Sequence, residues 1–230
     1  MKYLQSKSVF EHYLKIYENF QSEEEVKKIC KKYDIMKWTI NSDGLVDVDG
    51  NVNFHTSTER YKGIDLTEIP LKFGHVSGDF DCASNQLTSL EGCPQSVGGD
   101  FSCVGNKLLN LVGSPRKVEG AFHCGHNELI SLEGAPEYVG GPFYCTDNNI
   151  TTLEYGPQLV DDNFYCFRNP ISVVWNLISI DKDKWNKDIV DLLNDYDCIR
   201  GTDIIIDRFN SFLEEIGKPG VDFVEGYNNI

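Results

Sequence analysis

The sequence predicts an α/β repeat solenoid, in which short parallel β-strands stack between helical caps at the two ends of the chain. Three observations lead to this prediction: a 21-residue period in the middle of the chain, helical apolar patterns at both ends, and the absence of any run of about 18 or more apolar residues. The expected regions are an N-terminal helical region at 1–36, a β cap with a degenerate first repeat at 37–79, a solenoid of five coils at 80–174, and a C-terminal helical cap at 175–230.

Residues 1–36 are expected to form two helices. The first has an apolar stripe that includes Phe10, Leu14 and Tyr17, and it either belongs to the cap or docks on a partner. The second begins at Ser22, because Glu25 follows three residues later and completes a capping box.

Residues 37–79 predict a small β cap that leads into the repeats. Alternating runs at 38–40, 45–48 and 52–54 are separated by the turn sequences N-S-D-G and D-G. A degenerate repeat then continues through Leu66, Ile69, Val76 and Gly78. Such a cap covers the apolar end that a stack of repeats otherwise exposes.

The 21-residue period repeats several kinds of position in one register. Each coil opens with Phe-x-Cys, has Asn three residues after the Cys, and continues with two Leu-type positions and a return segment that contains Pro and Val. The columns are Phe80, Phe101, Phe122, Phe143 and Phe164; Cys82, Cys103, Cys124, Cys145 and Cys166; Asn85, Asn106, Asn127, Asn148 and Asn169; Leu87, Leu108, Leu129, Ile150 and Ile171; Leu90, Leu111, Leu132, Leu153 and Val174; Pro94, Pro115, Pro136 and Pro157; and Val97, Val118, Val139 and Val160.

Each column has a physical interpretation. Phe and Cys lie on one face of a short strand, because strand side chains alternate with a period of two. The Asn amide is expected to end the strand and to satisfy backbone groups in the following bend, and Pro with nearby Gly turns the chain back. One coil cannot fold alone, because burying five apolar side chains contributes roughly 10 kcal/mol, whereas ordering its backbone costs on the order of 30 kcal/mol. Neighbouring coils must supply the difference, so the coils stack.

At these residues the chain resembles the leucine-rich repeat, whose pattern is L-x-x-L-x-L-x-x-N-x-L. Phe101, Cys103, Asn106 and Leu108 occupy its second Leu, third Leu, Asn and final Leu positions. The period and the Pro in each return segment are similar to the short bacterial type. The Phe-x-Cys strand with S-L-E-G-x-P returns also resembles phage-encoded repeat proteins of unassigned function. The resemblance implies that ligands meet the outward residues of the strands.

The C-terminal region predicts two more helices. The first is expected from Asp183 to Asp195 and the second from Asp203 to Ile216, and Gly217 and Pro219 end the second one. They are expected to cap the stack. The competing expectation is that they fold over the outward face of the strands.

The cysteines are expected to be core residues and not metal ligands. Five of them occupy one position per coil, so they form a cysteine ladder in which each thiol acts as a small apolar group. His123 and His126 flank Cys124 as H-C-G-H, but the pleat turns His123 away from Cys124. The sequence predicts no metal site, no disulfide and no cofactor, and it favours a reducing compartment.

The chain is acidic, with a formal net charge of −15. Residues 45–174 hold seven Lys and Arg against 17 Asp and Glu. Such a surface repels phosphate groups, so direct binding to nucleic acid or to an anionic membrane is not expected, whereas a basic protein partner would be attracted. The first residues do not resemble a signal peptide. The expected location is the cytoplasm, or the host cytoplasm if the chain is encoded by a phage.

The candidate binding face consists of the outward residues of the strands and their bends. It is acidic at its start and aromatic at its end, and exposed, clustered aromatic residues are typical of protein-binding hot spots. The predicted partner-binding residues are Asp79, Asp81, Asp100, Ser102, His123, His126, Tyr144, Tyr165, Phe167 and Arg168.

The leading functional hypothesis is a non-catalytic protein-binding module. If the phage resemblance holds, this is a phage protein that engages or inhibits a host protein. The alternatives are a repeat-based substrate receptor of an enzyme with Cys198 as the nucleophile, an acidic mimic of nucleic acid, and a binder of small molecules at the aromatic end. No catalytic group of residues is recognisable in the sequence. The partner and the oligomeric state are not predicted.

Overall fold

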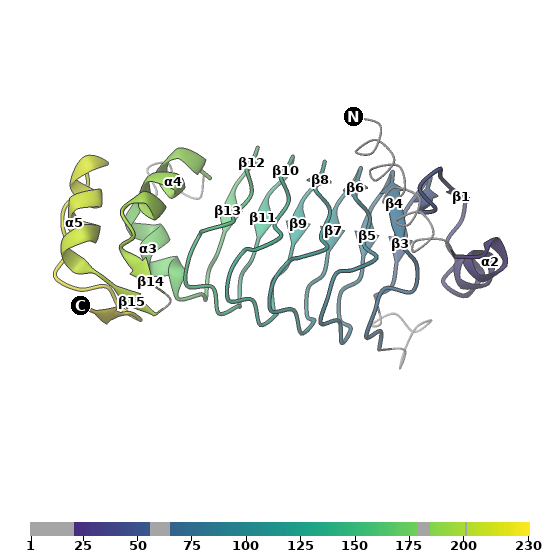
Figure 1. The fold of residues 1–230 in the computed structure, drawn as a ribbon, viewed down its shortest axis with the longest axis horizontal. Helices are drawn as coiled ribbons and strands as arrows, with labels where there is room; N and C mark the ends of the chain where they lie inside the picture. Colours follow the sequence, from purple (N-terminus) through teal and green to yellow (C-terminus); the bar gives the residue numbers. More distant parts are fainter. Residues whose placement is uncertain (1–20, 56–64, 179–184, 201) are drawn as a thin grey trace, which may run out of the picture.

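The computed structural model describes residues 21–55, 65–178, 185–200 and 202–230, so the first predicted helix lies outside the described residues. Coils of the chain lie side by side in one row, with α2 (Glu23–Lys32) near one end and three C-terminal helices at the other (Figure 1). The architecture is α/β, with parallel strands in two sheets and helices beyond both ends.

Helix α2 begins at the predicted residue. The Ser22 hydroxyl accepts a hydrogen bond from the Glu25 backbone N–H, and the Glu25 carboxylate accepts one from the Ser22 backbone N–H at 3.2 Å. This reciprocal pair confirms the predicted capping box. The helix buries Val26 and Cys30, and the Tyr33 ring that follows it packs edge-on against Phe54 at 4.9 Å. The first described helix therefore closes one end of the apolar core.

Each coil contributes two short strands, where the sequence predicted one. Sheet B contains the predicted Phe-x-Cys strands and the predicted run at 52–54, in the order β13-β11-β9-β7-β5-β3. Sheet A contains a second series in the order β1-β2-β4-β6-β8-β10-β12. The strands of sheet B are β3 (Val52–Asn53), β5 (Phe80–Asp81), β7 (Phe101–Ser102), β9 (Phe122–His123), β11 (Phe143–Tyr144) and β13 (Phe164–Tyr165). Those of sheet A are β1 (Trp38–Ile40), β2 (Val46–Val48), β4 (Phe73–Val76), β6 (Ser96–Val97), β8 (Lys117–Val118), β10 (Tyr138–Val139) and β12 (Leu159–Val160).

The register of both sheets follows the sequence period. Phe101 pairs with Phe122 in sheet B, and Val97 pairs with Val118 in sheet A, so both pairings are parallel and join residues one period apart. The β1–β2 hairpin is the antiparallel edge of sheet A, formed around the predicted N-S-D-G turn. A tight corner joins the two strands of each coil, and at Gly120 a Cβ atom would lie 2.2 Å from Asp100 Oδ1 and 2.8 Å from the Gly99 carbonyl oxygen. Adjacent coils approach so closely there that only glycine fits.

Columns of identical side chains fill the interior between the sheets. The Phe rings from Phe80 to Phe164 stack with centroids 5.0 to 5.7 Å apart, and the Phe, Cys and Leu columns are buried. The five cysteines of the ladder are free and buried. Their thiols point at the next coil: Cys82 Sγ donates to the Ser102 carbonyl oxygen at 3.2 Å, for example.

The Asn column links neighbouring coils more extensively than the sequence predicted. Asn106 Nδ2 donates to the carbonyl oxygen of Cys103 in its own coil at 3.0 Å and to that of Cys82 in the preceding coil at 3.1 Å. Its Oδ1 accepts the Leu87 backbone N–H of the preceding coil at 2.9 Å. The other four Asn side chains repeat this pattern. The buried amide therefore satisfies backbone groups of two coils at once.

The C-terminal region differs from the prediction at several boundaries. The fifth coil passes directly into α3 (Ile171–Ile178), so Ile171 and Val174, expected as Leu-type positions of a coil, lie buried in a helix. Helix α4 (Lys187–Asp195) begins after an Asn186 cap, and residues 183–184 of the predicted helix lie outside the described part. Residues 203–204, predicted as helical, form β15 (Asp203–Ile204) between β14 (Ile199–Arg200) and β16 (Asn228–Asn229), and α5 is Ile206–Glu215.

The C-terminal elements are attached to the stack by a specific contact. The Tyr227 hydroxyl donates to the Thr151 carbonyl oxygen at 2.7 Å, although 76 residues separate the two in the chain. Gly217 ends α5 with a left-handed φ of 71°, as predicted. In the described part of the chain, every helix is too short or too polar to cross a membrane.

Candidate functional site

The outward side chains of sheet B form one continuous column, which we call the sheet B column. Because the strands are parallel and in register, each member lies beside its counterpart in the next coil. From β3 to β13 the members are Asn53, Asp81, Ser102, His123, Tyr144 and Tyr165. The structure thus brings five of the predicted binding residues into one line.

The second half of this column is a stack of rings. His123 and Tyr144 lie 4.7 Å apart with an interplanar angle of 3°, and Tyr144 and Tyr165 lie 4.9 Å apart with an angle of 15°. Each ring half-buries its neighbours, so Tyr144 and Tyr165 are less exposed than their outward position suggested. Phe167 extends the cluster at 5.7 Å from Tyr165 and is 46% exposed. The stack is a rigid aromatic surface held by parallel strands.

The first half of the face carries three carboxylates. Asp79 and Asp100 form a ladder along the corners, since Asp79 Oδ1 accepts the Asp100 backbone N–H at 2.9 Å and Asp100 Oδ1 accepts that of Ala121 at 2.7 Å. Asp81 accepts its own coil's Ala83 N–H at 2.9 Å and pairs with His55 Nδ1 at 3.3 Å. These acids hold the coil edges in place and also make the face negative.

A hollow of about 360 Å³ lies over this acidic half. Strand residues of sheet B form its floor, and the described residues that line it include no Lys or Arg. The polar groups around it come from four coils: Asn51, Asn53, Asp79, Asp81, Asp100, Ser102 and His123. The predicted acidic and aromatic halves of the face therefore meet at His123.

Burial determines the protonation of the rings next to this hollow. Desolvation lowers the pKa of His123, against the opposing influence of Asp100 and Asp81, so the imidazole is neutral at neutral pH. Desolvation is also the main cause that raises the pKa of Tyr144, with Tyr165 and Asp162 adding to it. Both rings are uncharged hydrogen-bonding groups at neutral pH.

His126 and Arg168 lie in a different column from the rings. They belong to a series of left-handed residues just before each Asn: Ser84, Gly105, His126, Asp147 and Arg168, with φ between 55° and 69°. There Asp147 pairs with Arg168 at 2.9 Å and with His126 at 3.6 Å, and the Arg168 hydrogen bond is the main cause that lowers the pKa of Asp147. The two predicted residues thus lie on either side of the partly buried Asp147 carboxylate. Cys124 is buried in the cysteine ladder, whereas His123 belongs to the sheet B column and His126 to the left-handed series.

The thiols of Cys124, Cys145 and Cys198 are poorly suited to nucleophilic chemistry. Burial raises the pKa of Cys124 and Cys145 well above the ordinary value, and it raises the pKa of Cys198 to about 11. A nucleophilic cysteine needs the opposite shift, because the thiolate is the reactive form. Cys198 is also fully buried, and its thiol donates to the Leu193 carbonyl oxygen at 3.8 Å.

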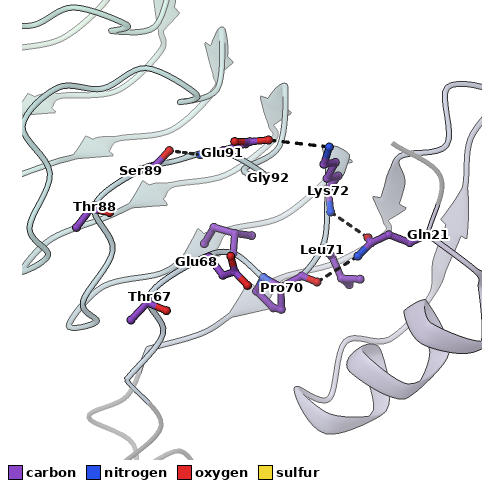
Figure 2. Close-up of a pocket in the computed structure, with 11 residues that line it drawn as sticks. Gln21, Thr67, Glu68, Pro70, Leu71, Lys72, Thr88, Ser89, Glu91 and Gly92 are labelled. Atoms are coloured by element: carbon purple, nitrogen blue, oxygen red, sulfur yellow. Dashed lines mark hydrogen bonds and ion pairs between the residues drawn. The ribbon is translucent and has the colours of Figure 1, made fainter. Parts of the chain in front are cut away.

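A second hollow of about 420 Å³ lies among the return segments, away from the predicted residues. Figure 2 shows Gln21 bridging its edge, where it donates to the Pro70 carbonyl oxygen and accepts the Lys72 backbone N–H. Lys72 also reaches Glu91 at 3.9 Å. Because Gln21 bonds to the backbone at its edge, we assign this hollow to the attachment of Gln21 to the first repeats.

Sequence reasoning missed Asn53 and Asp147 as parts of this surface. Asn53 lies 28 residues before Asp81, and not 21, so the period did not identify it. Asp147 belongs to the left-handed column, for which Gly105 was the sequence signal. The C-terminal helices lie beyond the end of the row (Figure 1). Phe167 is exposed. No described C-terminal helix covers the ring stack.

Comparisons with known proteins gave no match: no family model, no curated protein and no solved structure matches the chain. A fold hosts many functions, so the function is argued from the geometry of the sheet B face itself.

Proposed function

We propose that the chain is a non-catalytic protein-binding module, built on a solenoid of the leucine-rich-repeat type, and that the sheet B column contacts the partner. The ordered ring stack of His123, Tyr144 and Tyr165 is the observation that supports this proposal. The Phe column already fills the interior of the sheet, so these outward rings are not needed for the core. Rings held in place before binding lose little conformational entropy when a partner arrives.

The charge of the chain supports a partner with a basic surface. The net charge is −15, and Asp79, Asp81 and Asp100 concentrate negative charge on the same face as the rings. Opposite charges increase the rate of encounter. By analogy with the phage proteins that the repeats resemble, the partner would be a host protein in the host cytoplasm, engaged or inhibited by this chain.

Two alternative functions receive less support. A substrate receptor that uses Cys198 as a nucleophile would need a thiol with a lowered pKa, and burial raises this one. A mimic of nucleic acid would need carboxylates along the whole face, whereas coils three to five of the sheet B column carry rings. Binding through a mixed acidic and aromatic face remains the proposal.

The test is capture of the partner from the native host with matched variants. The face variant carries Tyr144→Ala, Tyr165→Ala and Phe167→Ala. The control variant carries Leu109→Ala, Val112→Ala and Ile130→Ala, three exposed apolar residues of the return segments. We expect the wild type and the control variant to retain one stoichiometric partner, identified by mass spectrometry, and the face variant to lose it while circular dichroism shows it folded. Retention by a folded face variant would contradict the proposal.

A further inference from the structure

The ring stack of the sheet B column is interrupted at Ser102. One face of the His123 ring is covered by Tyr144 at 4.7 Å. On its other side, the register places Ser102 of the preceding coil, whose side chain is too small to cover a ring. This uncovered side of His123 borders the 360 Å³ hollow. The column therefore has an empty slot one residue wide at Ser102.

The slot has room for one flat group. Adjacent strands lie about 4.8 Å apart, so Asp81 and His123, two coils apart in the column, are separated by roughly 10 Å. Neighbouring rings in the existing stack are 4.7 to 4.9 Å apart. A planar group inserted over Ser102 would continue the stack at the same spacing.

The walls of the slot favour a positive charge. Asp100 uses Oδ1 to accept the Ala121 N–H, and among the described residues nothing donates to its other oxygen. Asp81 shares its carboxylate with Ala83 and His55, and it lines the hollow. The neutral His123 ring does not repel a cation. The slot therefore suits a group that is both planar and positively charged, and the guanidinium group is such a group. An ammonium group carries the charge but is compact and cannot stack on a ring.

We propose that the slot over Ser102 binds the guanidinium group of an arginine side chain of the partner protein, stacked on His123 and paired with Asp100 and Asp81. This inference rests on the proposed function, because it assumes a protein partner at the sheet B face. It goes further in specifying the side chain that the partner inserts and the position where it lies.

The direct test uses short peptides with the full-length chain. Three peptides of the form acetyl-Gly-X-Gly-amide carry arginine, lysine or citrulline, the last being planar but uncharged. NMR titration follows the ring signals of His123. We expect the arginine peptide to bind about tenfold more tightly than either of the others. Lysine lacks the stacking and citrulline lacks the charge, and each of these contributions is worth about that factor in affinity. Equal binding of arginine and lysine would overturn the stacking, and equal binding of arginine and citrulline would overturn the ion pair.

Variants locate the binding to the slot. Ser102→Tyr fills it with the residue that coils four and five carry at this position, so the fold should accept it while arginine binding is lost. Ser102→Ala is the matched control and should bind as the wild type does. Asp100→Asn keeps the acceptor for the Ala121 N–H but removes the charge, and about tenfold weaker binding is expected. Unchanged arginine binding by folded Ser102→Tyr, or by Asp100→Asn, would overturn the proposal.

The same variants separate this inference from the proposed function. If partner capture is lost both in Ser102→Tyr and in the face variant, both proposals are supported. If capture survives Ser102→Tyr but not the face variant, the arginine slot is wrong and the binding face stands. If capture survives in both variants, the proposed function itself fails.

Discussion

At the scale of single residues, Asn127 shows how one side chain holds two coils together. Its Nδ2 donates to the carbonyl oxygens of Cys124 and Cys103, and its Oδ1 accepts the Leu108 N–H of the preceding coil at 3.1 Å. Asn127→Ala leaves these buried backbone groups unsatisfied, so we expect the free energy of unfolding to fall by about 3 kcal/mol in urea denaturation. The control is Asn149→Ala, an exposed position where a change within about 0.5 kcal/mol is expected. Equal effects of the two substitutions would contradict the role of the Asn column.

Tyr155 is a residue in a backbone conformation that suits glycine. Its φ is 63°, and the equivalent positions in the three preceding coils are Gly92, Gly113 and Gly134 with φ of 93°, 93° and 86°. Tyr155→Gly removes the steric strain of a Cβ in this conformation, so we expect the free energy of unfolding to rise by about 1 kcal/mol. Tyr155→Ala keeps the Cβ and serves as the control. A Tyr155→Gly protein no more stable than Tyr155→Ala would show that no strain is present.

Sequence reasoning assigned the interior most completely, because each interior column keeps one chemical type. Phe, Cys and Asn recur unchanged, so the period alone assigned them to the interior. The left-handed column contains Ser, Gly, His, Asp and Arg, which share a backbone angle and no side-chain property. The slot over Ser102 was missed for a related reason. It exists because the Ser102 side chain is much smaller than the ring of His123 in the next coil, and the sequence alone does not place these two residues side by side.

At the scale of elements, strands β6, β8, β10 and β12 of sheet A were missed because each contains only two residues. Alternation needs about four residues to be recognised, and the Ser-Val, Lys-Val, Tyr-Val and Leu-Val strands are shorter than that.

Helix α3 was missed for a different reason. The two Leu-type positions of a coil are three residues apart, which is also the spacing of a helical face, so Ile171 and Val174 fit both structures.

Because of the cysteine ladder, we expect the free energy of unfolding to fall at alkaline pH. Burial raises the pKa of Cys103, Cys124 and Cys145 in the folded protein. Below the pKa of the unfolded thiol both states are protonated and the stability is fully present. Above it only the unfolded chain loses protons, so the free energy of unfolding falls as pH rises, by about 1.4 kcal/mol per pH unit for each buried thiol.

Cys124→Ala tests this linkage, because it removes one of the buried thiols. We expect the variant to be less stable at pH 7, since it leaves a small cavity, and to lose stability less steeply than the wild type above about pH 9. Urea denaturation at a series of pH values measures both slopes. Parallel curves for the two proteins would exclude a contribution from Cys124.

At the scale of the whole molecule, the acidic charge is expected to control how fast a partner arrives. With a net charge of −15, the chain attracts a basic partner over distances that salt screens. Once the native partner is identified, its association rate constant should fall by about tenfold between low and high salt, while the dissociation rate constant changes little. Surface plasmon resonance at several ionic strengths measures both constants. An association rate that does not depend on salt would contradict electrostatic attraction.

The sequence repeats every 21 residues, and the strands of neighbouring coils pair at the same spacing. This agreement determines how the protein can change its length. Between the five repeated coils, the side-chain hydrogen bonds of the Asn column join residues 19 or 24 apart, and the strands pair one period apart. An in-frame duplication of 21 codons would therefore add a layer whose every group finds an equivalent partner, and the molecule would grow by about 4.8 Å. An insertion of any other size must loop out, as between Val52 and Phe80, which pair 28 residues apart. The gene can thus lengthen or shorten the protein in whole steps, and each step moves the acidic and aromatic halves of the face relative to each other.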